Sequence, residues 1–205
     1  MERTYIFTAF ERFWHWTQAL LIIGMLVTGF EIHGTYKLLG FHDAHVVHTT
    51  AVWALVGLWG LAIFWHLTTG EWRQYIPTMK NMDKVVRFYA VGIFRGEAHP
   101  FHPTRARKHN QAQAYLAMTV LVSPLIWISG MAYLFHPQLA AAGIGPALAT
   151  VATVHTLGAF LMLAFLIGHI YLATTGHSPL AHIKSMVTGW DEEPAHAAPP
   201  TTGQA

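Results

Sequence analysis

Long apolar stretches occur four times along this chain of 205 residues, separated by more polar connections. They cover approximately residues 13–33, 45–67, 110–135 and 151–175. A helix rises 1.5 Å per residue, so roughly 20 residues cross the ~30 Å hydrocarbon layer of a membrane. Each stretch is long enough, and Glu31, at the edge of the first, is the only acidic or basic residue in any of them apart from histidine. The pattern predicts an all-α integral membrane protein built as a four-helix transmembrane bundle.

The composition supports a membrane protein, because 53% of the residues are hydrophobic and only 11% are charged. Soluble domains typically have about a quarter of charged residues. The first stretch is too long for the apolar region of a signal peptide, so we expect it to remain as a helix. We predict one membrane domain over residues 1–190 and a disordered tail over 191–205, where acidic residues are followed by Pro, Ala and Thr.

Positive charge is concentrated at the N-terminus and in the second connection, whereas the first connection has only Lys37 and the third has none. By the positive-inside rule, both termini and the second connection are predicted to be cytoplasmic. We predict a multi-pass protein of the bacterial inner membrane. The cationic residues of the second connection are Arg73, Lys80, Lys84, Arg87, Arg95, Arg105, Arg107 and Lys108.

Part of the second connection has the periodicity of an amphipathic helix. Its apolar side would carry Met82, Val85, Val86, Tyr89 and Ile93, and its opposite side would carry Lys80, Lys84 and Arg87. The pattern predicts a cytoplasmic interfacial helix between spans two and three, with its cationic side toward anionic lipid headgroups. A solvated linker helix is the alternative.

Histidines are the candidate functional groups, since the chain has fifteen of them and no cysteine. The lack of cysteine excludes disulfides, thiolate-bound iron–sulfur clusters and covalently attached c-type haem. An imidazole inside a bilayer is costly unless it is paired or coordinated. His155 and His169 are fourteen residues apart on the fourth span, so they share a helix face at a separation of about 21 Å. Two b-type haems at two depths, each held by two histidines, require this arrangement.

Depth in the membrane restricts which histidines can complete the two pairs. In span two, His48 and His66 are eighteen residues apart, or about 27 Å. Pairing both of them with His155 and His169 would mismatch the depths by roughly 6 Å, so only one can serve. His66, at the inner end, is interpreted as a neighbour of a haem propionate or of a quinone rather than as a ligand.

The four predicted iron ligands therefore come from three different spans. His48 and His155 lie at similar distances from the outer surface and are assigned to an outer haem. His15 and His169 lie at similar distances from the cytoplasm and are assigned to an inner haem. His45, one turn before His48, is the alternative outer ligand.

Short motifs in the four spans occur in an order found in one known family. They are Arg12-Phe13-Trp14-His15-Trp16, Val46-Val47-His48, His109-Asn110-Gln111-Ala112-Gln113, His155-Thr156-Leu157-Gly158 and His169-Ile170-Tyr171. Over roughly residues 5 to 190 the chain resembles the di-haem cytochrome b subunits of nickel–iron hydrogenases, formate dehydrogenases (gamma subunit) and thiosulfate-reductase-type complexes. The resemblance implies the same ligand pairs.

The resemblance also implies a quinone pocket beside the inner haem, with Asn110 and Gln113 at the matching positions and His66 nearby. The alternative interpretation of Asn110 and Gln113 is ordinary helix capping. The implied function is a quinone-reactive membrane anchor of an oxidoreductase complex. It would carry electrons between menaquinone or ubiquinone and a periplasmic redox subunit: a multihaem cytochrome c, an iron–sulfur protein, a hydrogenase or a molybdenum enzyme subunit. No nucleic-acid partner is expected.

Two other functions fit the same histidines. One is a free-standing small bacterial cytochrome b that reacts directly with a soluble redox species. The other is a non-haem, histidine-rich transporter that uses the imidazoles as relay groups.

Overall fold

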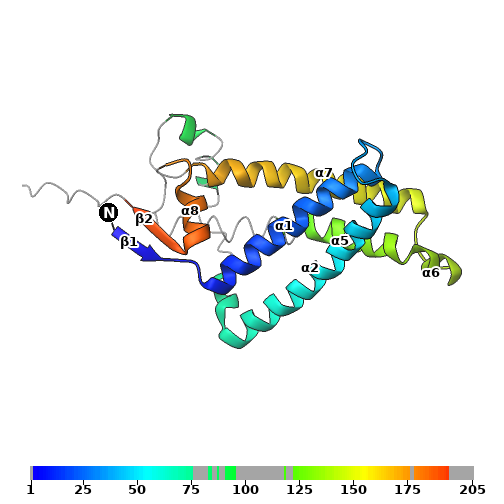
Figure 1. Ribbon diagram of the computed structural model, residues 1–205, viewed down its shortest axis with the longest axis horizontal. Coiled ribbons are helices and arrows are strands. Elements are labelled where there is room, and N and C mark those ends of the chain that lie inside the picture. The colour runs from blue at the N-terminus through cyan, green and yellow to red at the C-terminus, as the bar shows by residue number, and fades with distance from the viewer. Residues whose placement is uncertain are drawn as a thin grey trace, which may run out of the picture. The chain divides into compact units, whose positions relative to one another are not determined.

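Long helices dominate the computed structural model, which describes residues 2–75, 83–84, 87, 91–95, 118, 122–175 and 178–193. The helices α1 (Ala9–Ile32), α2 (Phe41–Thr69) and α7 (Leu148–Ala173) are each long and apolar enough to cross a membrane (Figure 1). The chain forms two compact units, one of Met1–Trp59 with Leu166–Ala205 and one of Gly60–Phe165. Both α2 and α7 begin in one unit and end in the other.

The third predicted span is described only in part. Helix α5 (Ser123–Leu134) is apolar and is followed by the short helix α6 (His136–Ala141). Most of residues 110–121 and most of the predicted amphipathic segment lie outside the described residues. The described parts of the second connection include two short 3-10 turns, η1 (Glu71–Tyr75) and η2 (Gly92–Arg95). The count of four spans and the cytoplasmic location of the termini therefore remain predictions.

Helix α1 begins four residues before the predicted apolar stretch because its first turn is capped. The Thr8 hydroxyl accepts a hydrogen bond from the Glu11 amide at 3.3 Å, and the Glu11 carboxylate accepts one from the Thr8 amide at 2.8 Å. This reciprocal capping box satisfies amide groups that a helix start otherwise leaves unpaired. The helix therefore includes a polar first turn that hydropathy alone does not detect.

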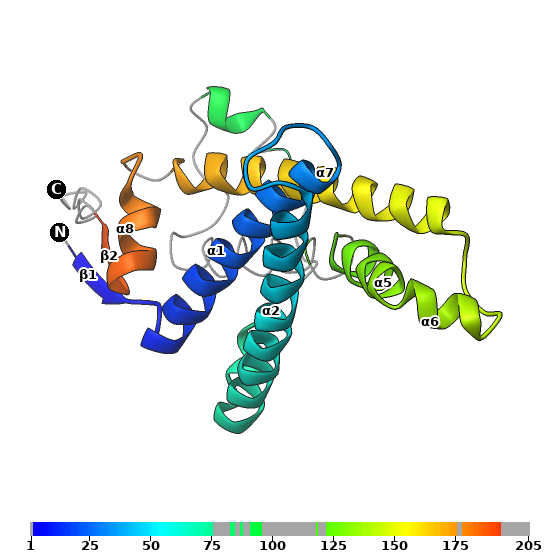
Figure 2. The same cartoon turned by 45° about the vertical axis from the view of Figure 1, so that its right-hand side comes forward.

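The two ends of the chain form a small sheet that the all-α prediction did not include. Strand β1 (Glu2–Tyr5) pairs antiparallel with β2 (Trp190–Glu193), and β2 follows the short helix α8 (Ala181–Thr188), as Figure 2 shows. Residues 191–193, assigned from the sequence to the disordered tail, thus belong to a strand. The rest of that tail, residues 194–205, lies outside the described residues.

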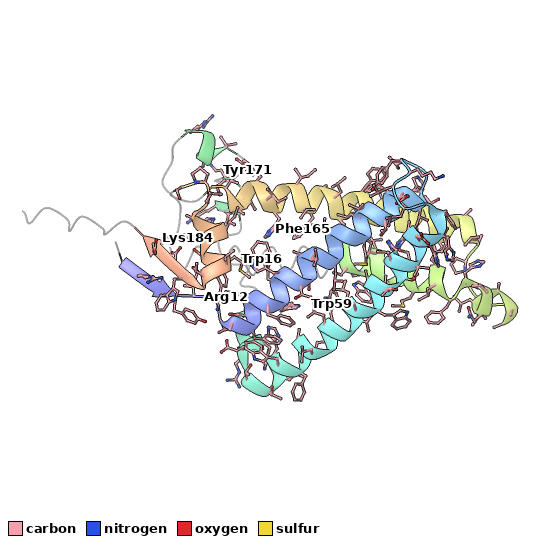
Figure 3. The ribbon with its side chains drawn as sticks, viewed as in Figure 1. Arg12, Trp16, Trp59, Phe165, Tyr171 and Lys184 are labelled. Atoms are coloured by element: carbon pink, nitrogen blue, oxygen red, sulfur yellow. The ribbon has the colours of Figure 1, made fainter. Side chains whose placement is uncertain are left out.

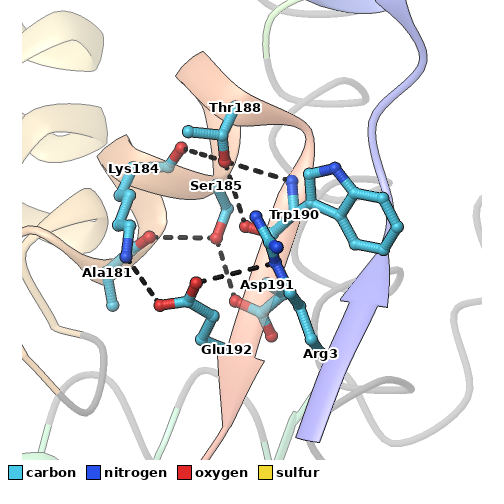
Figure 4. A network of polar contacts seen from close by, with 8 residues as sticks. All are labelled: Arg3, Ala181, Lys184, Ser185, Thr188, Trp190, Asp191 and Glu192. Atoms are coloured by element: carbon cyan, nitrogen blue, oxygen red, sulfur yellow. Dashed lines mark hydrogen bonds and ion pairs between the residues drawn. The ribbon is translucent and has the colours of Figure 1, made fainter.

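Polar side chains connect α8 to the sheet (Figure 4). The Ser185 hydroxyl donates to Asp191 at 2.9 Å, and the Lys184 ammonium donates to Glu192 at 2.6 Å. The Arg3 guanidinium lies 3.7 Å from the same Glu192 carboxylate. The hydrogen bond and positive charge of Lys184 hold the pKa of Glu192 below its usual value. These contacts explain why an acidic segment forms a strand here.

The start of α1 is attached to the C-terminal segment. Arg12 donates a hydrogen bond to the Val187 carbonyl at 2.8 Å, and the Trp16 indole donates one to Met186 at 3.1 Å. Figure 3 shows both side chains on α1, on the side toward α8. Gly189 has a φ of 85°, and a Cβ there would lie 2.7 Å from the Phe7 carbonyl oxygen, so this close approach requires glycine.

Large apolar side chains lie exposed along the long helices. Leu20, Phe64 and Ile167 are 72%, 65% and 63% exposed. Such extensive apolar surface is unfavourable in water but suits contact with lipid chains. The helices therefore have the surface of membrane-spanning elements.

The connection between α1 and α2 is built around a buried carboxylate. One oxygen of Glu31, which is 5% exposed, accepts hydrogen bonds from the amides of Leu38, Leu39 and Gly40 at 2.6, 2.6 and 2.7 Å. These amides directly precede α2, so an acidic group near the helix start is electrostatically favourable. Glu31 thus sets where α2 begins.

Replacing Glu31 by alanine should lower the melting temperature of the protein, because the amides of Leu38, Leu39 and Gly40 lose a charged acceptor. A Glu31→Gln variant, which keeps one acceptor oxygen, should lose less. Thermal unfolding in detergent measures both effects. The control is Glu71→Gln, since the Glu71 carboxylate accepts no hydrogen bond within the described ranges. Equal melting temperatures for Glu31→Ala and the control would contradict this role.

Candidate functional site

His15 and His169 face each other within one compact unit. His15 lies on α1 and His169 on the last two turns of α7, and their ring centres are 6.0 Å apart with planes inclined by 49°. The Trp16 ring stands edge-on to His15 at 5.1 Å. The structure therefore brings together the two histidines predicted to hold the inner haem.

The spacing of this pair fits a metal ion held between the rings. Metal–imidazole bonds of about 2 Å place the two ligating nitrogens about 4 Å apart and the ring centres about 6 Å apart. The Nδ1 of His15 is buried and has no hydrogen-bond partner among the described residues. The buried Nε of Arg12, one turn earlier on α1, likewise has none within that part of the chain. Unpaired buried polar atoms are uncommon, and the one on the Arg12 guanidinium suits a bound anionic group such as a haem.

His48 is seated against α1 in the same unit. Its Nδ1 lies 3.1 Å from the hydroxyl of Thr28, and a Cβ at the neighbouring Gly29 would lie 3.3 Å from its Cε1. By contrast, His45 is exposed and stacks on Phe41 of its own helix, with ring centres 6.4 Å apart. This geometry favours His48 over His45 as the inward-facing ligand.

His155 is seated in the same manner in the other unit. Its Nδ1 lies 3.1 Å from the hydroxyl of Ser129 on α5, and a Cβ at Gly130 would lie 3.1 Å from its Cε1. The ring of Tyr133, one turn further along α5, lies 6.2 Å away. His48 and His155 belong to different units, so their pairing remains a prediction.

His66 is buried on α2, and its Nδ1 lies 2.6 Å from the Ala62 carbonyl oxygen one turn earlier. A carbonyl can only accept, so the Nδ1 of His66 is the donor in this hydrogen bond. Asn110 and Gln113, predicted beside it at a quinone pocket, lie outside the described residues.

Sequence reasoning missed the hydroxyl–glycine pairs Thr28-Gly29 and Ser129-Gly130. Each is a small polar residue followed by glycine within an otherwise apolar helix. Small residues at such positions allow close approach of a neighbouring group. That signal was present in the sequence, but which side chain approaches them depends on the packing of separate helices.

Comparison with known proteins identifies the type of chain. Residues 6–189 match the family model described as prokaryotic cytochrome b561. The chain is also 31% identical over 199 residues to the "Putative cytochrome YdhU" of Escherichia coli (strain K12), covering 92% of this chain and 75% of that protein. No solved structure matches.

Proposed function

Because the chain belongs to the prokaryotic cytochrome b561 family, we propose that it is a di-haem subunit that carries electrons between a periplasmic redox partner and membrane quinone. It is a membrane cytochrome b, and its b-type haem supplies an iron that accepts and releases one electron at a time. In this proposal it spans the bacterial inner membrane with both termini in the cytoplasm. The catalytic chemistry belongs to the partner subunit of an oxidoreductase complex.

The facing rings of His15 and His169 are the observation that carries this proposal. Two imidazoles from separate helices at a ring-centre distance of 6.0 Å suit a bis-histidine iron site within the membrane. Metal binding uses the neutral form of the imidazole.

The second proposed site uses His48 and His155. Because His155 and His169 lie about 21 Å apart along α7, this helix would contribute one ligand at each of two depths. The protein would thus hold two redox groups in sequence between its outer and inner surfaces. This arrangement supports transfer across the membrane better than the relay chemistry of a transporter.

Quinone reactivity requires hydrogen bonds to two carbonyl groups and a route for protons. We assign these roles to Asn110, Gln113 and His66. Asn110 and Gln113 are three residues apart, so on a helix their side chains share a face. His66, whose Nδ1 donates to the Ala62 carbonyl oxygen, is the residue that we place on the proton route.

Substituting both Asn110 and Gln113 by leucine should leave two haems per chain but reduce quinol oxidation at least about tenfold, since the headgroup loses its hydrogen bonds. Steady-state turnover with a quinol analogue and haem content by absorption spectroscopy measure the two effects. Gln111→Leu is the matched control, because adjacent residues face different sides of a helix. Unchanged turnover in the double variant would move the quinone site elsewhere.

A further inference from the structure

Two histidines on different helices have similar local support, and His155 has in addition a hydrogen bond with the backbone of Ile126. His48 on α2 contacts Thr28-Gly29 of α1, and His155 on α7 contacts Ser129-Gly130 of α5. In each case a hydroxyl oxygen lies 3.1 Å from the imidazole Nδ1, and the next residue is a glycine beside the Cε1 edge of the ring. The two arrangements occur in separate units of the structure, so each is an independent observation.

The hydroxyl groups are oriented by their own helices. Thr28 donates its hydroxyl proton to the Gly24 carbonyl at 2.8 Å, and Ser129 donates its proton to the Leu125 carbonyl, in both cases four residues earlier. A hydroxyl has one proton to donate and two lone pairs that accept. With the proton directed to the carbonyl, the oxygen is available to accept from the imidazole. Nδ1 of each histidine is then the protonated nitrogen, and Nε2 keeps the lone pair that a metal needs.

The glycines allow this approach. A Cβ at Gly29 would lie 3.3 Å from Cε1 of His48, and one at Gly130 would lie 3.1 Å from Cε1 of His155. Both distances are shorter than ordinary van der Waals contact, so a side chain there would push the ring away from the hydroxyl. Glycine therefore permits each imidazole to lie against the helix that carries its hydrogen-bond acceptor.

We propose that Thr28 and Ser129 are positioning residues that fix the protonated Nδ1 of His48 and His155 and leave Nε2 of each ring for the iron. This inference rests on the proposed function, since it assigns these histidines as ligands. Within a membrane, where water does not compete, such a hydrogen bond strongly orients the ring. It also makes the ligating nitrogen more electron-rich, which favours the oxidised iron.

Within the described residues, a hydroxyl group contacts the Nδ1 of His48 and the Nδ1 of His155 but not that of His15. The Nδ1 of His15 has no hydrogen-bond partner among the residues described. Substitution of Thr28 or Ser129 should therefore change the haem held by His48 and His155 without changing the haem held by His15 and His169.

The test uses the purified full-length protein and two pairs of variants. Thr28→Val and Ser129→Ala remove the hydroxyl with little change of shape, whereas Thr28→Ser and Ser129→Thr keep it. Potentiometric titration of the haem absorption bands should show an upward shift of one midpoint potential in the first pair only. Each tenfold loss of preference for the oxidised iron corresponds to about 59 mV for one electron. The second haem should be unshifted throughout.

The outcomes separate this inference from the proposed function. A wild-type protein without haem would overturn the proposed function. Two haems with unshifted potentials in Thr28→Val and Ser129→Ala would overturn the positioning role while leaving the function intact. Where a variant loses haem altogether, nitrogen NMR of histidine-labelled protein without haem reports whether Nδ1 is protonated. Loss of that protonated form in Thr28→Val, with recovery in Thr28→Ser, supports the proposal, and an unchanged spectrum contradicts it.

Discussion

A His169→Ala variant should retain one b-type haem per chain where the wild-type protein is proposed to hold two, and it should no longer exchange electrons with quinol. In the proposed inner pair, this substitution would leave His15 as the single ligand, and one histidine would be insufficient to hold the haem. The His15→Ala variant should behave in the same way. Haem extraction and quantification give the stoichiometry, and reduction by a quinol analogue gives the reactivity.

His66→Ala is the informative control for this experiment. His66 is a buried histidine in an apolar helix, as a ligand would be, but its Nδ1 hydrogen bond is to its own helix. This variant should keep both haems and lose only part of its quinone turnover. A His66→Ala protein with one haem, or a His169→Ala protein with two, would show that the inner pair is misassigned.

The positions of the long helices could be predicted from the sequence because length and hydropathy are local properties. The predicted stretches 13–33, 45–67 and 151–175 correspond to α1, α2 and α7. Their ends differ by up to four residues, since capping groups such as Thr8 and Glu11 extend a helix through polar positions. The assignment to a cytochrome b membrane family, made from histidine-containing motifs in four spans, is confirmed by the family match.

The terminal sheet could not be predicted in this way. Strands β1 and β2 have four residues each and lie at opposite ends of the chain, so neither has a recognisable local pattern. Their pairing depends on the attachment of α8 to α1 through Arg12 and Trp16. Such contacts between distant segments depend on tertiary structure and leave no local signal in the sequence. Taken by itself, the acidic composition of residues 191–193 suggested disorder.

The candidate ligands were predictable because histidine is costly inside a membrane, so its presence in an apolar helix is informative. The groups that orient these ligands were not predicted. Thr28 and Ser129 are common residues in membrane helices, and their own carbonyl-directed hydrogen bonds satisfy them without any partner. Only the packing of α2 on α1, and of α7 on α5, shows which imidazole each hydroxyl meets.

The outer site should respond to mutation in the opposite manner to the inner site. His48→Ala and His155→Ala should each leave one haem per chain, and the remaining haem should still be reduced by quinol because His15 and His169 are intact. Electron transfer to an external acceptor should fall to background in both variants, since the outer haem is the proposed exit. Haem quantification, quinol reduction and acceptor reduction measured on the same preparations distinguish the two sites.

His45→Ala is the matched control for the outer site, because His45 lies one turn from His48 on α2 but is exposed and stacked on Phe41. It should keep both haems and wild-type electron transfer. If His45→Ala loses a haem and His48→Ala does not, His45 is the outer ligand, and the hydrogen bond of His48 to Thr28 has only a structural role. If His48→Ala and His155→Ala lose spectrally different haems, the two histidines do not share an iron. Loss of the same haem in both variants is the result that the proposed pairing requires.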